Sequence, residues 1–310
     1  MSKDKTYKVI AIIGPTASGK SGLAIQLAKE FNGEIVNADS RQIYKYMDIG
    51  TAKDSDDDPN DELYTVDGIV HHLIDFVDPK RNFSVAEFQK LAYEKIQNIT
   101  ERGKLPFLVG GTGLWVDAVC KGFVFPKSEQ QRSLRDKLAD KTADELFDIL
   151  YEINPNRLEK LNKSDLLNPV RLIRAIEIEM GKQDPNNSTS SDSKELQIES
   201  LYLSPKTNIE QLEQRIYARV DKMFEAGLID ENKRLLEMGY TYDLPSMSGI
   251  GYKEFEGYFE GKRNLNEVKE EIKLRTRQYA KRQITWFKKN ETIQYVNPDE
   301  AINLISLFLK

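Results

Sequence analysis

Gly14-Pro15-Thr16-Ala17-Ser18-Gly19-Lys20-Ser21 has the G-x-x-x-x-G-K-S spacing of a phosphate-binding loop (P-loop). The apolar run at 9–13 predicts a buried parallel strand before it, and the residues after it predict a helix whose apolar face holds Leu23, Ala24, Leu27, Ala28 and Phe31. Glycines at both ends of the loop allow successive backbone N–H groups to meet phosphate oxygens at the N-terminus of that helix. We expect Lys20 to reach the terminal phosphates and the Ser21 hydroxyl to ligate Mg²⁺. The loop predicts a phosphorylated ligand without specifying which one.

The composition is typical of a globular protein. The chain has 310 residues, of which 39% are hydrophobic and 31% are charged. The apolar run before Gly14 is too short for a signal peptide, and no stretch has the apolar length needed to cross a bilayer. Cys120 is the only cysteine, so no disulfide can form within the chain, which favours a reducing compartment. We expect a cytoplasmic protein that does not associate with a membrane.

Charge is unevenly distributed along the chain, whose net charge is −5. Residues 54–62 hold six acidic side chains, whereas residues 269–289 are strongly basic. A basic ridge on one helix face is predicted by four cations at a spacing of four residues: Lys269, Lys273, Arg277 and Lys281. Because local fields govern contact with nucleic acid, this ridge is a candidate RNA-binding surface, and an ordinary solvated helix face is the alternative.

The order of predicted elements in the first part of the chain indicates an α/β fold. Apolar runs at 34–38, 71–74 and 105–109 predict strands, and helical patterns near 84–102 and 112–120 lie between and after them. Such alternation predicts a parallel sheet flanked by helices, with the P-loop after its first strand.

The later part of the chain predicts a helical insertion and then a return to the sheet. The strand signal disappears from 121 to 182, where the last helix is marked by Asn168 as N-cap and Pro169 in the first turn. Beyond a polar linker, Thr207 and Glu210 predict a capping box that opens a helix. The remaining pattern predicts strands at 198–203 and 292–296, helices around 247–260 and 266–289, and a final helix. We therefore expect a P-loop core at 1–120, a mostly helical insertion at 121–196, and the second part of the core, with its basic helices, at 197–310.

Two polar positions after predicted strands are candidates for the reaction. P-loop enzymes that hydrolyse nucleotides usually place an Asp at the end of a second apolar strand, but the strand at 105–109 ends in Gly110-Gly111-Thr112-Gly113. This difference favours a small transferase over a nucleotide hydrolase. The strand at 34–38 leads into Asp39, and since the carboxyl ends of parallel strands line one crevice, Asp39 and Thr112 should both face the P-loop. Helix capping is the alternative role for both residues.

Seven further motifs follow the P-loop in a defined order. They are 39–44 (DSRQIY), 47–53 (MDIGTAK), 71–75 (HHLID), 110–114 (GGTGL), 171–175 (RLIRA), 249–254 (GIGYKE) and 276–287 (TRQYAKRQITWF). In this order they closely resemble the bacterial tRNA dimethylallyltransferases, also called tRNA isopentenyltransferases, from about residue 8 to about residue 297. Trp115 and Val170 depart from the family pattern, which usually has Tyr and often has Gln at these positions.

The resemblance implies a reaction and a fold. The family transfers a dimethylallyl group from dimethylallyl diphosphate to N6 of the adenosine 3′ to the anticodon, position 37 of the tRNA, and releases diphosphate. Its fold is similar to that of P-loop kinases, with a helical insertion that grips the anticodon stem-loop. For this chain we accordingly expect Mg²⁺ as the cofactor and a monomer as the active form.

The resemblance also implies roles for individual residues. Asp39 is expected to accept the N6 proton, and Thr112 to lie close to the reacting centre. Arg215 and Arg219 lie four residues apart on one predicted helix face, and Arg215 is expected to stabilise the departing diphosphate. Contacts to tRNA are expected from Asp39, Ser40, Arg41, Gln42 and Thr112 near the flipped adenine, and from Arg135, Arg171, Arg174, Lys281 and Arg282 elsewhere.

Three other functions stay open at this level. They are an ATP-dependent small-molecule kinase, an isopentenyltransferase that acts on a free adenylate, and a non-enzymatic RNA-binding protein built on a P-loop scaffold. The long insertion and the basic C-terminal helix favour a tRNA substrate over free AMP. The joint presence of Lys20, Ser21, Asp39 and Thr112 argues against an inactive scaffold.

Overall fold

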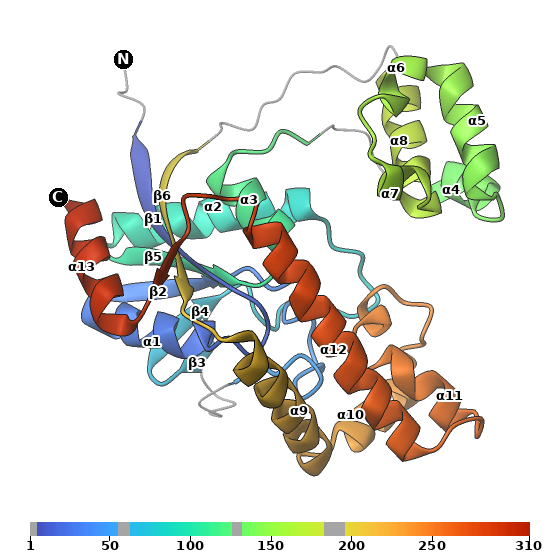
Figure 1. Cartoon of the computed structure of the whole chain (residues 1–310). Coiled ribbons are helices and arrows are strands. Elements are labelled where there is room, and N and C mark those ends of the chain that lie inside the picture. Colours follow the sequence, from blue (N-terminus) through green and yellow to red (C-terminus); the bar gives the residue numbers. More distant parts are fainter. Residues whose placement is uncertain (1–4, 55–62, 126–131, 183–195) are drawn as a thin grey trace. The chain divides into compact units, whose positions relative to one another are not determined.

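The computed structural model, which describes residues 5–54, 63–125, 132–182 and 196–310, contains a seven-stranded sheet (Figure 1). Its strands are β1 (Thr6–Ile13), β2 (Gly33–Asn37), β3 (Thr65–Val66), β4 (Ile69–His72), β5 (Leu105–Gly110), β6 (Gln197–Pro205) and β7 (Gln294–Val296). Their order in space is β3-β4-β2-β5-β1-β6-β7, and every neighbouring pair is parallel except the β3–β4 hairpin. The α/β class with a parallel sheet is confirmed, whereas the short β3 was not anticipated.

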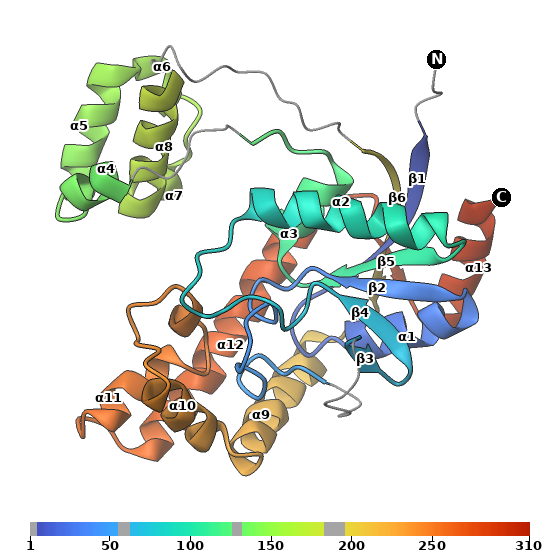
Figure 2. The ribbon, with the colours of Figure 1, turned by 180° about the vertical axis from the view of Figure 1, so that it is seen from behind.

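Helices cover both faces of the sheet, as the two opposite views show (Figures 1 and 2). On one face, α2 (Val85–Glu101) and α3 (Gly113–Cys120) pack against Val9, Ala11 and Ile13 of β1. On the other face, α1 (Lys20–Glu30) and α13 (Pro298–Leu309) pack against Ile10 and Ile12. Alternate side chains of a strand point to opposite faces, so β1 is apolar on both sides and its sequence is a continuous apolar run.

The carboxyl ends of β1, β2 and β5 meet at one edge of the sheet. β5 lies between the other two strands, with Gly110 opposite Ile13 and Val109 opposite Asn37. A Cβ atom on Gly110 would lie 2.2 Å from the carbonyl oxygen of Ala38, so only glycine allows the two chains to approach this closely. The P-loop, the turn at Asp39 and the turn at 110–113 therefore leave the sheet next to one another.

The C-terminal third forms a group of helices beside this edge: α9 (Ile209–Glu225), α10 (Leu228–Glu237), α11 (Glu256–Phe259) and α12 (Leu265–Phe287). α12 packs along α9, and it also contacts α3 (Figure 1). None of the helices in the described part of the chain is long and apolar enough to span a bilayer.

Two local predictions in this region are wrong. α9 begins after Asn208, whose side chain accepts a hydrogen bond from the Glu210 N–H, while the Thr207 hydroxyl instead donates to the Pro205 carbonyl. The stretch at 247–260 contains two short 3₁₀ turns before α11 rather than one helix. Gly251 explains the interruption, because its φ of +93° is not compatible with a continuous helix.

Residues 124–195 form a second compact unit, separate from the unit made of residues 1–123 and 196–310. Its helices are α4 (Arg132–Leu138), α5 (Ala143–Ile153), α6 (Pro155–Leu158), α7 (Lys163–Leu166) and α8 (Pro169–Lys182). Asn168 accepts the N–H of Arg171 at 3.3 Å, as expected for the residue that opens α8. A small apolar core is contributed mainly by α5 and α8.

Glu34 of β2 is a buried carboxylate that ties three segments together. Arg102 donates to it through both terminal nitrogens at 2.6 Å, and Lys104 and His72 each donate at 2.7 Å. The Arg102 guanidinium, helped by Lys104 and His72, holds the pKa of Glu34 far below its usual range even though burial opposes this shift. The ionised carboxylate is thus favoured in the folded protein.

Glu34→Gln is expected to lower the free energy of unfolding by about 3 kcal/mol at pH 7, because three donors lose their anion. A lowered pKa in the folded state contributes stability that is complete above the unfolded value of about 4.5 and is lost as the pH falls below it. Urea unfolding at pH 7 and pH 3.5 should therefore show the difference between the two proteins shrinking at the lower pH. An exposed control, Glu30→Gln on α1, should behave like the wild type at both pH values.

Candidate active site

The P-loop leaves the N-terminus of α1 without a side-chain cap, as the predicted anion-binding site requires. Gly14 and Gly19 have φ angles of +152° and +89°, which let the chain turn around the position of a bound anion. Gly19 is the N-cap of α1, no side chain caps the helix, and no acidic residue lies in its first turn. By contrast α2, α5, α12 and α13 all begin with capping boxes. The free N–H groups and the helix dipole at α1 are thus available to a phosphate group.

Lys20 lies between an acid and a second cation. Removal of water from around its ammonium group lowers the pKa of Lys20 to about 8, while Asp39 raises it and Arg219 lowers it further. Its nitrogen is 3.5 Å from the Pro15 carbonyl oxygen, a weak contact. Lys20 is therefore positioned to exchange a weak contact for a strong one when an anion binds.

Arg219, rather than Arg215, is the arginine of α9 that reaches the P-loop. Its guanidinium donates to the Thr16 hydroxyl at 3.1 Å and lies close enough to Lys20 and Asp39 to interact with both. Burial lowers the pKa of Arg219, as expected for a cation held away from water until an anion arrives. Arg215 lies one turn earlier and is exposed. Sequence spacing alone placed both on one face, and only the packing of α9 distinguishes them.

Asp39 and Thr112 come together from two different strands. The Asp39 carboxylate accepts the N–H of Arg41 at 2.9 Å, which fixes its direction at the end of β2. The Thr112 hydroxyl accepts the N–H of Ser40 at 3.1 Å and donates to the Ser40 hydroxyl at 3.3 Å. Although Thr112 stands at the N-cap position of α3, its side chain caps nothing. The capping alternative is therefore wrong for Thr112, whose hydroxyl joins the two turns.

One pocket contains both the phosphate-binding groups and the carboxylate. Its polar wall includes Thr16, Lys20, Ser21, Asp39 and Arg219. Its apolar wall includes Ile25, Ile35, Val66, Ile74 and Val109. The pocket therefore combines groups suited to a highly charged ligand with aliphatic side chains.

Two residues of α12 contact the loops beside this pocket, and the sequence predicted no role for either. Burial, together with the charge of Asp39, raises the pKa of Tyr279 to about 12, and its hydroxyl interacts with Thr112. Gln283 is buried and bonds both the P-loop and the turn at 110–113. Both lie in the motif at 276–287, and their spacing of four residues was the one signal that they share a face.

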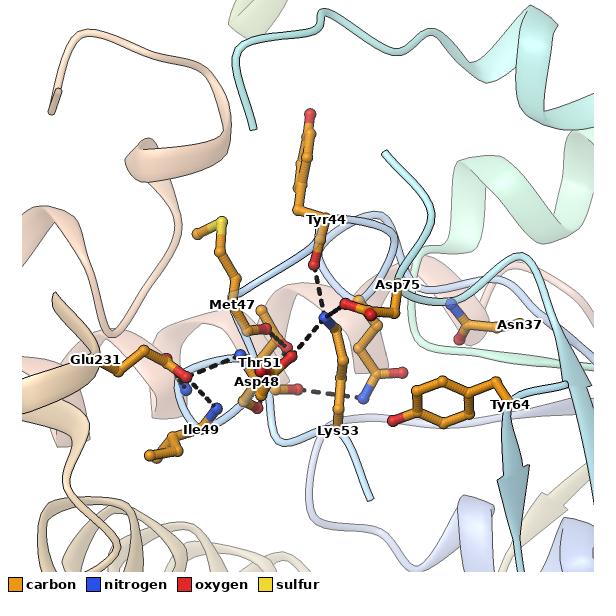
Figure 3. Close-up of polar contacts among 12 residues, drawn as sticks. Asn37, Tyr44, Met47, Asp48, Ile49, Thr51, Lys53, Tyr64, Asp75 and Glu231 are labelled. Atoms are coloured by element: carbon orange, nitrogen blue, oxygen red, sulfur yellow. Dashed lines mark hydrogen bonds and ion pairs between the residues drawn. The ribbon is translucent and has the colours of Figure 1, made fainter. Parts of the chain in front are cut away.

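The loop at 47–53 contributes Thr51 to the pocket lining. Two buried charged side chains hold this loop in place (Figure 3). Glu231 of α10 accepts three consecutive backbone N–H groups, those of Asp48, Ile49 and Gly50, at 2.8–3.0 Å. Tyr252 donates to the same carboxylate at 2.8 Å. The four donors satisfy the hydrogen-bonding capacity of this buried carboxylate. Glu231 therefore holds the backbone of the loop in one position.

Lys53 holds the other end of this loop (Figure 3). Its ammonium group donates to the Tyr44 carbonyl at 2.6 Å and to Asp48 at 2.8 Å, and it also pairs with Asp75. Asp75 ends the motif at 71–75, and Tyr252 belongs to the motif at 249–254. Three motifs with no assigned chemistry thus meet in one network that shapes the pocket wall.

Arg41 and Gln42 are both engaged within the protein. Arg41 donates to the Pro245 carbonyl at 2.7 Å, and Gln42 donates to the carbonyls of Thr51 and Ala52 at 3.2 and 3.0 Å. Gln42 also lines the pocket. Their contacts position the turn after Asp39, and their predicted contacts with tRNA stay predictions.

The predicted basic ridge is not one open face. Lys269 and Lys273 pair with Asp221 of α9 at 2.8 and 3.0 Å, and Arg277 pairs with Glu213 at 2.8 Å. Two acids of α9 thus pair with three of the four cations where the two helices pack together. Lys281 and its neighbour Arg282 are exposed and form no ion pair within the described residues.

The arginines of the insertion are held by its own carboxylates. Arg135 and Arg174 both donate to the buried Glu177, at 2.6 and 3.1 Å. Arg171 pairs with Asp165 on α7. Each of the three side chains keeps part of its surface in solvent, so a structural role is observed and RNA contact stays a prediction.

Ser21 is the one residue predicted to ligate a metal ion. It is exposed in the first turn of α1 and lines the same pocket as Asp39. Within the described residues, no group of three or more His, Cys, Asp or Glu side chains is placed to hold a metal ion. This donor set fits a cation bound mainly through substrate oxygens and water, as Mg²⁺ usually is, with a single hydroxyl from the protein.

A parallel sheet, an uncapped helix after the P-loop and a facing carboxylate are typical of kinase-like P-loop enzymes that act on phosphorylated substrates. Comparison with known proteins is more specific. Residues 42–290 match the IPP transferase family and residues 7–72 match isopentenyl transferases, so the chain belongs to the IPP transferase family.

Individual relatives extend over nearly the whole chain. A tRNA dimethylallyltransferase of Acetivibrio thermocellus is 42% identical over 94% of this chain and 92% of its own. The crystal structure of a tRNA isopentenylpyrophosphate transferase from Bacillus halodurans is similar with a TM-score of 0.69 at 37% identity, covering 98% of this chain and 96% of that one. A eukaryotic dimethylallyltransferase acting on tRNA is similar with a TM-score of 0.71 at 32% identity, covering 91% and 70% of the two chains.

Proposed function

We propose that this enzyme transfers the dimethylallyl group of dimethylallyl diphosphate to N6 of the adenosine at position 37 of tRNA and releases diphosphate. Its family makes it a prenyltransferase that modifies an adenosine of tRNA. The observation that carries the finer assignment is one pocket lined by Lys20, Arg219 and Asp39, beside which the Thr112 hydroxyl bonds the turn after Asp39.

Departure of diphosphate is the first requirement of this reaction. The bond between the allylic carbon and the diphosphate oxygen breaks, and its electron pair stays on oxygen. Lys20, Arg219 and the N–H groups at the start of α1 stabilise that growing negative charge. The aliphatic wall of the pocket suits the dimethylallyl group, which has no polar atom to satisfy.

Attack by adenine is the second requirement. The exocyclic N6 is a poor nucleophile because its lone pair is delocalised into the ring. As the new carbon–nitrogen bond forms, Asp39 accepts the N6 proton, and Thr112 and Tyr279 orient the groups beside it. The adenine has to leave the stack of the RNA loop to enter the pocket.

A divalent cation is expected from the prenyltransferase family, and we propose Mg²⁺. The Ser21 hydroxyl and the oxygens of the bound diphosphate would hold it. When bound, it neutralises charge on the leaving group. Lys20 and Arg219 contribute in the same direction from the protein.

The proposed macromolecular partner is the anticodon stem-loop of tRNA, bound by a monomer in the cytoplasm. Lys281 and Arg282 are the cations of α12 that remain open to solvent. Arg135, Arg171 and Arg174 are proposed to contact the RNA backbone with the parts of their side chains that stay exposed.

Labelled dimethylallyl diphosphate tests the function directly. The protein is incubated with the label and one of three acceptors: bulk tRNA, AMP, or small molecules together with ATP. We expect label in tRNA alone, at an adenosine, with no need for ATP. Label in AMP would indicate an adenylate isopentenyltransferase, and an absolute requirement for ATP would indicate a kinase.

Two arginines of α9 provide a matched pair for testing the diphosphate site. Arg219→Ala is expected to lower kcat/KM for dimethylallyl diphosphate by about 100-fold, because a partly buried charge that stabilises the leaving group is lost. Arg215→Ala removes the same side chain one turn away, where it is exposed, and should change kcat/KM less than threefold. The reverse order of effects would return the role to Arg215.

A further inference from the structure

Gln283 bonds the two loops that meet at the reacting centre. Its side chain is only 4% exposed. Oε1 accepts the backbone N–H of Thr16 in the P-loop at 2.9 Å, and Nε2 donates to the carbonyl oxygen of Gly111 at 2.9 Å. One amide thus connects the phosphate-binding loop to the turn that carries Thr112.

The fit around this amide leaves little freedom. A Cβ atom on Gly111 would lie 2.2 Å from Nε2 of Gln283. Thr16 is held from both sides, since its N–H bonds Gln283 and its hydroxyl accepts from Arg219. The Thr16 N–H is thereby committed to α12 and not to a phosphate oxygen, so Gln283 acts on the position of the loop and not on the anion itself.

The neighbours of Gln283 on α12 hold the same turn. Tyr279, one turn earlier, interacts with Thr112. Trp286, one turn later, lies against Gly113, where a Cβ atom would be 2.2 Å from its ring, and donates to Asp117 at 3.0 Å. Positions 279, 283 and 286 share one helix face, which therefore follows the turn at 110–113 into α3.

We propose that Gln283 is a positioning residue that sets the distance between the diphosphate site and the site of the nucleophile. The proposal rests on the proposed transfer reaction, in which the carbon of one substrate must meet N6 of the other. The P-loop holds the first substrate, and Asp39 and Thr112 hold the second. Misplacement of reacting groups by about 1 Å can cost about 100-fold in rate even when both substrates still bind.

Gln283→Met tests this role, because methionine has a similar length and neither donates nor accepts a strong hydrogen bond. We expect the single-turnover rate constant at saturating dimethylallyl diphosphate and tRNA to fall at least about tenfold. The Kd for inorganic diphosphate should change less than about threefold, since Lys20 and Arg219 stay in place. A residue needed only for stability would not separate these two quantities.

Gln89→Met is the matched control. Gln89 of α2 also donates to backbone carbonyls, those of Ala118 and Phe123, at 2.6 and 3.0 Å, but these lie in neither the P-loop nor the turn at 110–113. Both variants are measured at least 10 °C below the lower melting temperature. We expect the control to lose stability without a loss in single-turnover rate beyond about twofold.

Gly111→Ala disturbs the contact between Gln283 and Gly111 through its other partner. It replaces Gln283→Met as the test if that variant does not fold. Its methyl group must displace the Gln283 amide, so the single-turnover rate should again fall with little change in the Kd for diphosphate. In the double variant the losses should not multiply, because both changes break one contact.

The outcomes are separable. Wild-type protein that transfers no label contradicts the proposed function. Active wild type together with a Gln283→Met rate within threefold of it, or with a rate loss matched by Gln89→Met, overturns the role of Gln283. A diphosphate Kd that weakens as much as the rate would also overturn it, by showing that the residue acts on anion binding.

Discussion

Lys20→Ala is expected to lower dimethylallyl transfer to tRNA at least about 100-fold, the scale for losing one strong stabiliser of developing charge. The ammonium group lies at the uncapped N-terminus of α1, in the pocket that also contains Asp39 and Arg219. Without it, fewer positive charges face the leaving group. The Kd for diphosphate should therefore rise, and kcat should fall. Transfer is measured with labelled dimethylallyl diphosphate, and binding by titration with inorganic diphosphate.

The pH dependence of binding identifies the charge of Lys20 itself. Because its pKa in the free protein is about 8, the ammonium form predominates below pH 8 and declines above it. Diphosphate binding by the wild type should therefore weaken between pH 7 and pH 9 more than binding by Lys20→Ala, since both proteins meet the same ionisation of the ligand. Lys29→Ala, an exposed change on the same helix, should follow the wild type. Parallel profiles for Lys20→Ala and the wild type would exclude this role.

Asp39→Asn is the second change with a large expected effect, a fall in kcat of about 100-fold to about 10,000-fold. Asparagine keeps an oxygen that can accept the Arg41 N–H, so the turn after β2 should keep its shape. An amide cannot accept the N6 proton, which leaves the attack without its base. The Kd values for tRNA and diphosphate should change little, and kcat should carry the loss.

Asp54 provides the comparison for this experiment because it is a second carboxylate in the same pocket. Asp54→Asn should leave kcat within about threefold of the wild type. If Asp54→Asn had the larger effect, Asp54 would be the base. If Asp39→Asn kept kcat and only weakened the binding of Mg²⁺, Asp39 would be a metal-associated residue and the base would have to be sought elsewhere.

Local signals in the sequence were sufficient for the P-loop and for most of the sheet. The run before Gly14 is apolar on both faces, as a strand covered by helices on both sides requires, and the Gly and Lys spacing after it is that of a P-loop. Asp39 and Thr112 could be placed near the loop because parallel strands bring their carboxyl ends to one edge. These inferences depend on residues within a few positions of each other, or on a rule that holds for every such sheet.

Contacts between distant segments could not be inferred in the same way. Arg215 and Arg219 lie four residues apart and share one face of α9. The packing of α9 nevertheless brings only Arg219 to Thr16. The cations of α12 form a regular ridge in the sequence, but Asp221 and Glu213 of α9 form ion pairs with three of them. A helical repeat indicates which residues share a face and not which partner that face meets.

The sequence by itself determined the strand–loop–helix unit around Lys20, the α/β class and the helical character of the insertion, because each follows from short-range periodicity and backbone preference. Only the tertiary structure decided that Gln283 joins Thr16 to Gly111, that Glu231 and Lys53 hold the loop at 47–53, and which arginine enters the pocket. The physical reason is that a buried polar group needs its partners wherever the fold places them. Those partners lie as far as 267 positions away in the chain.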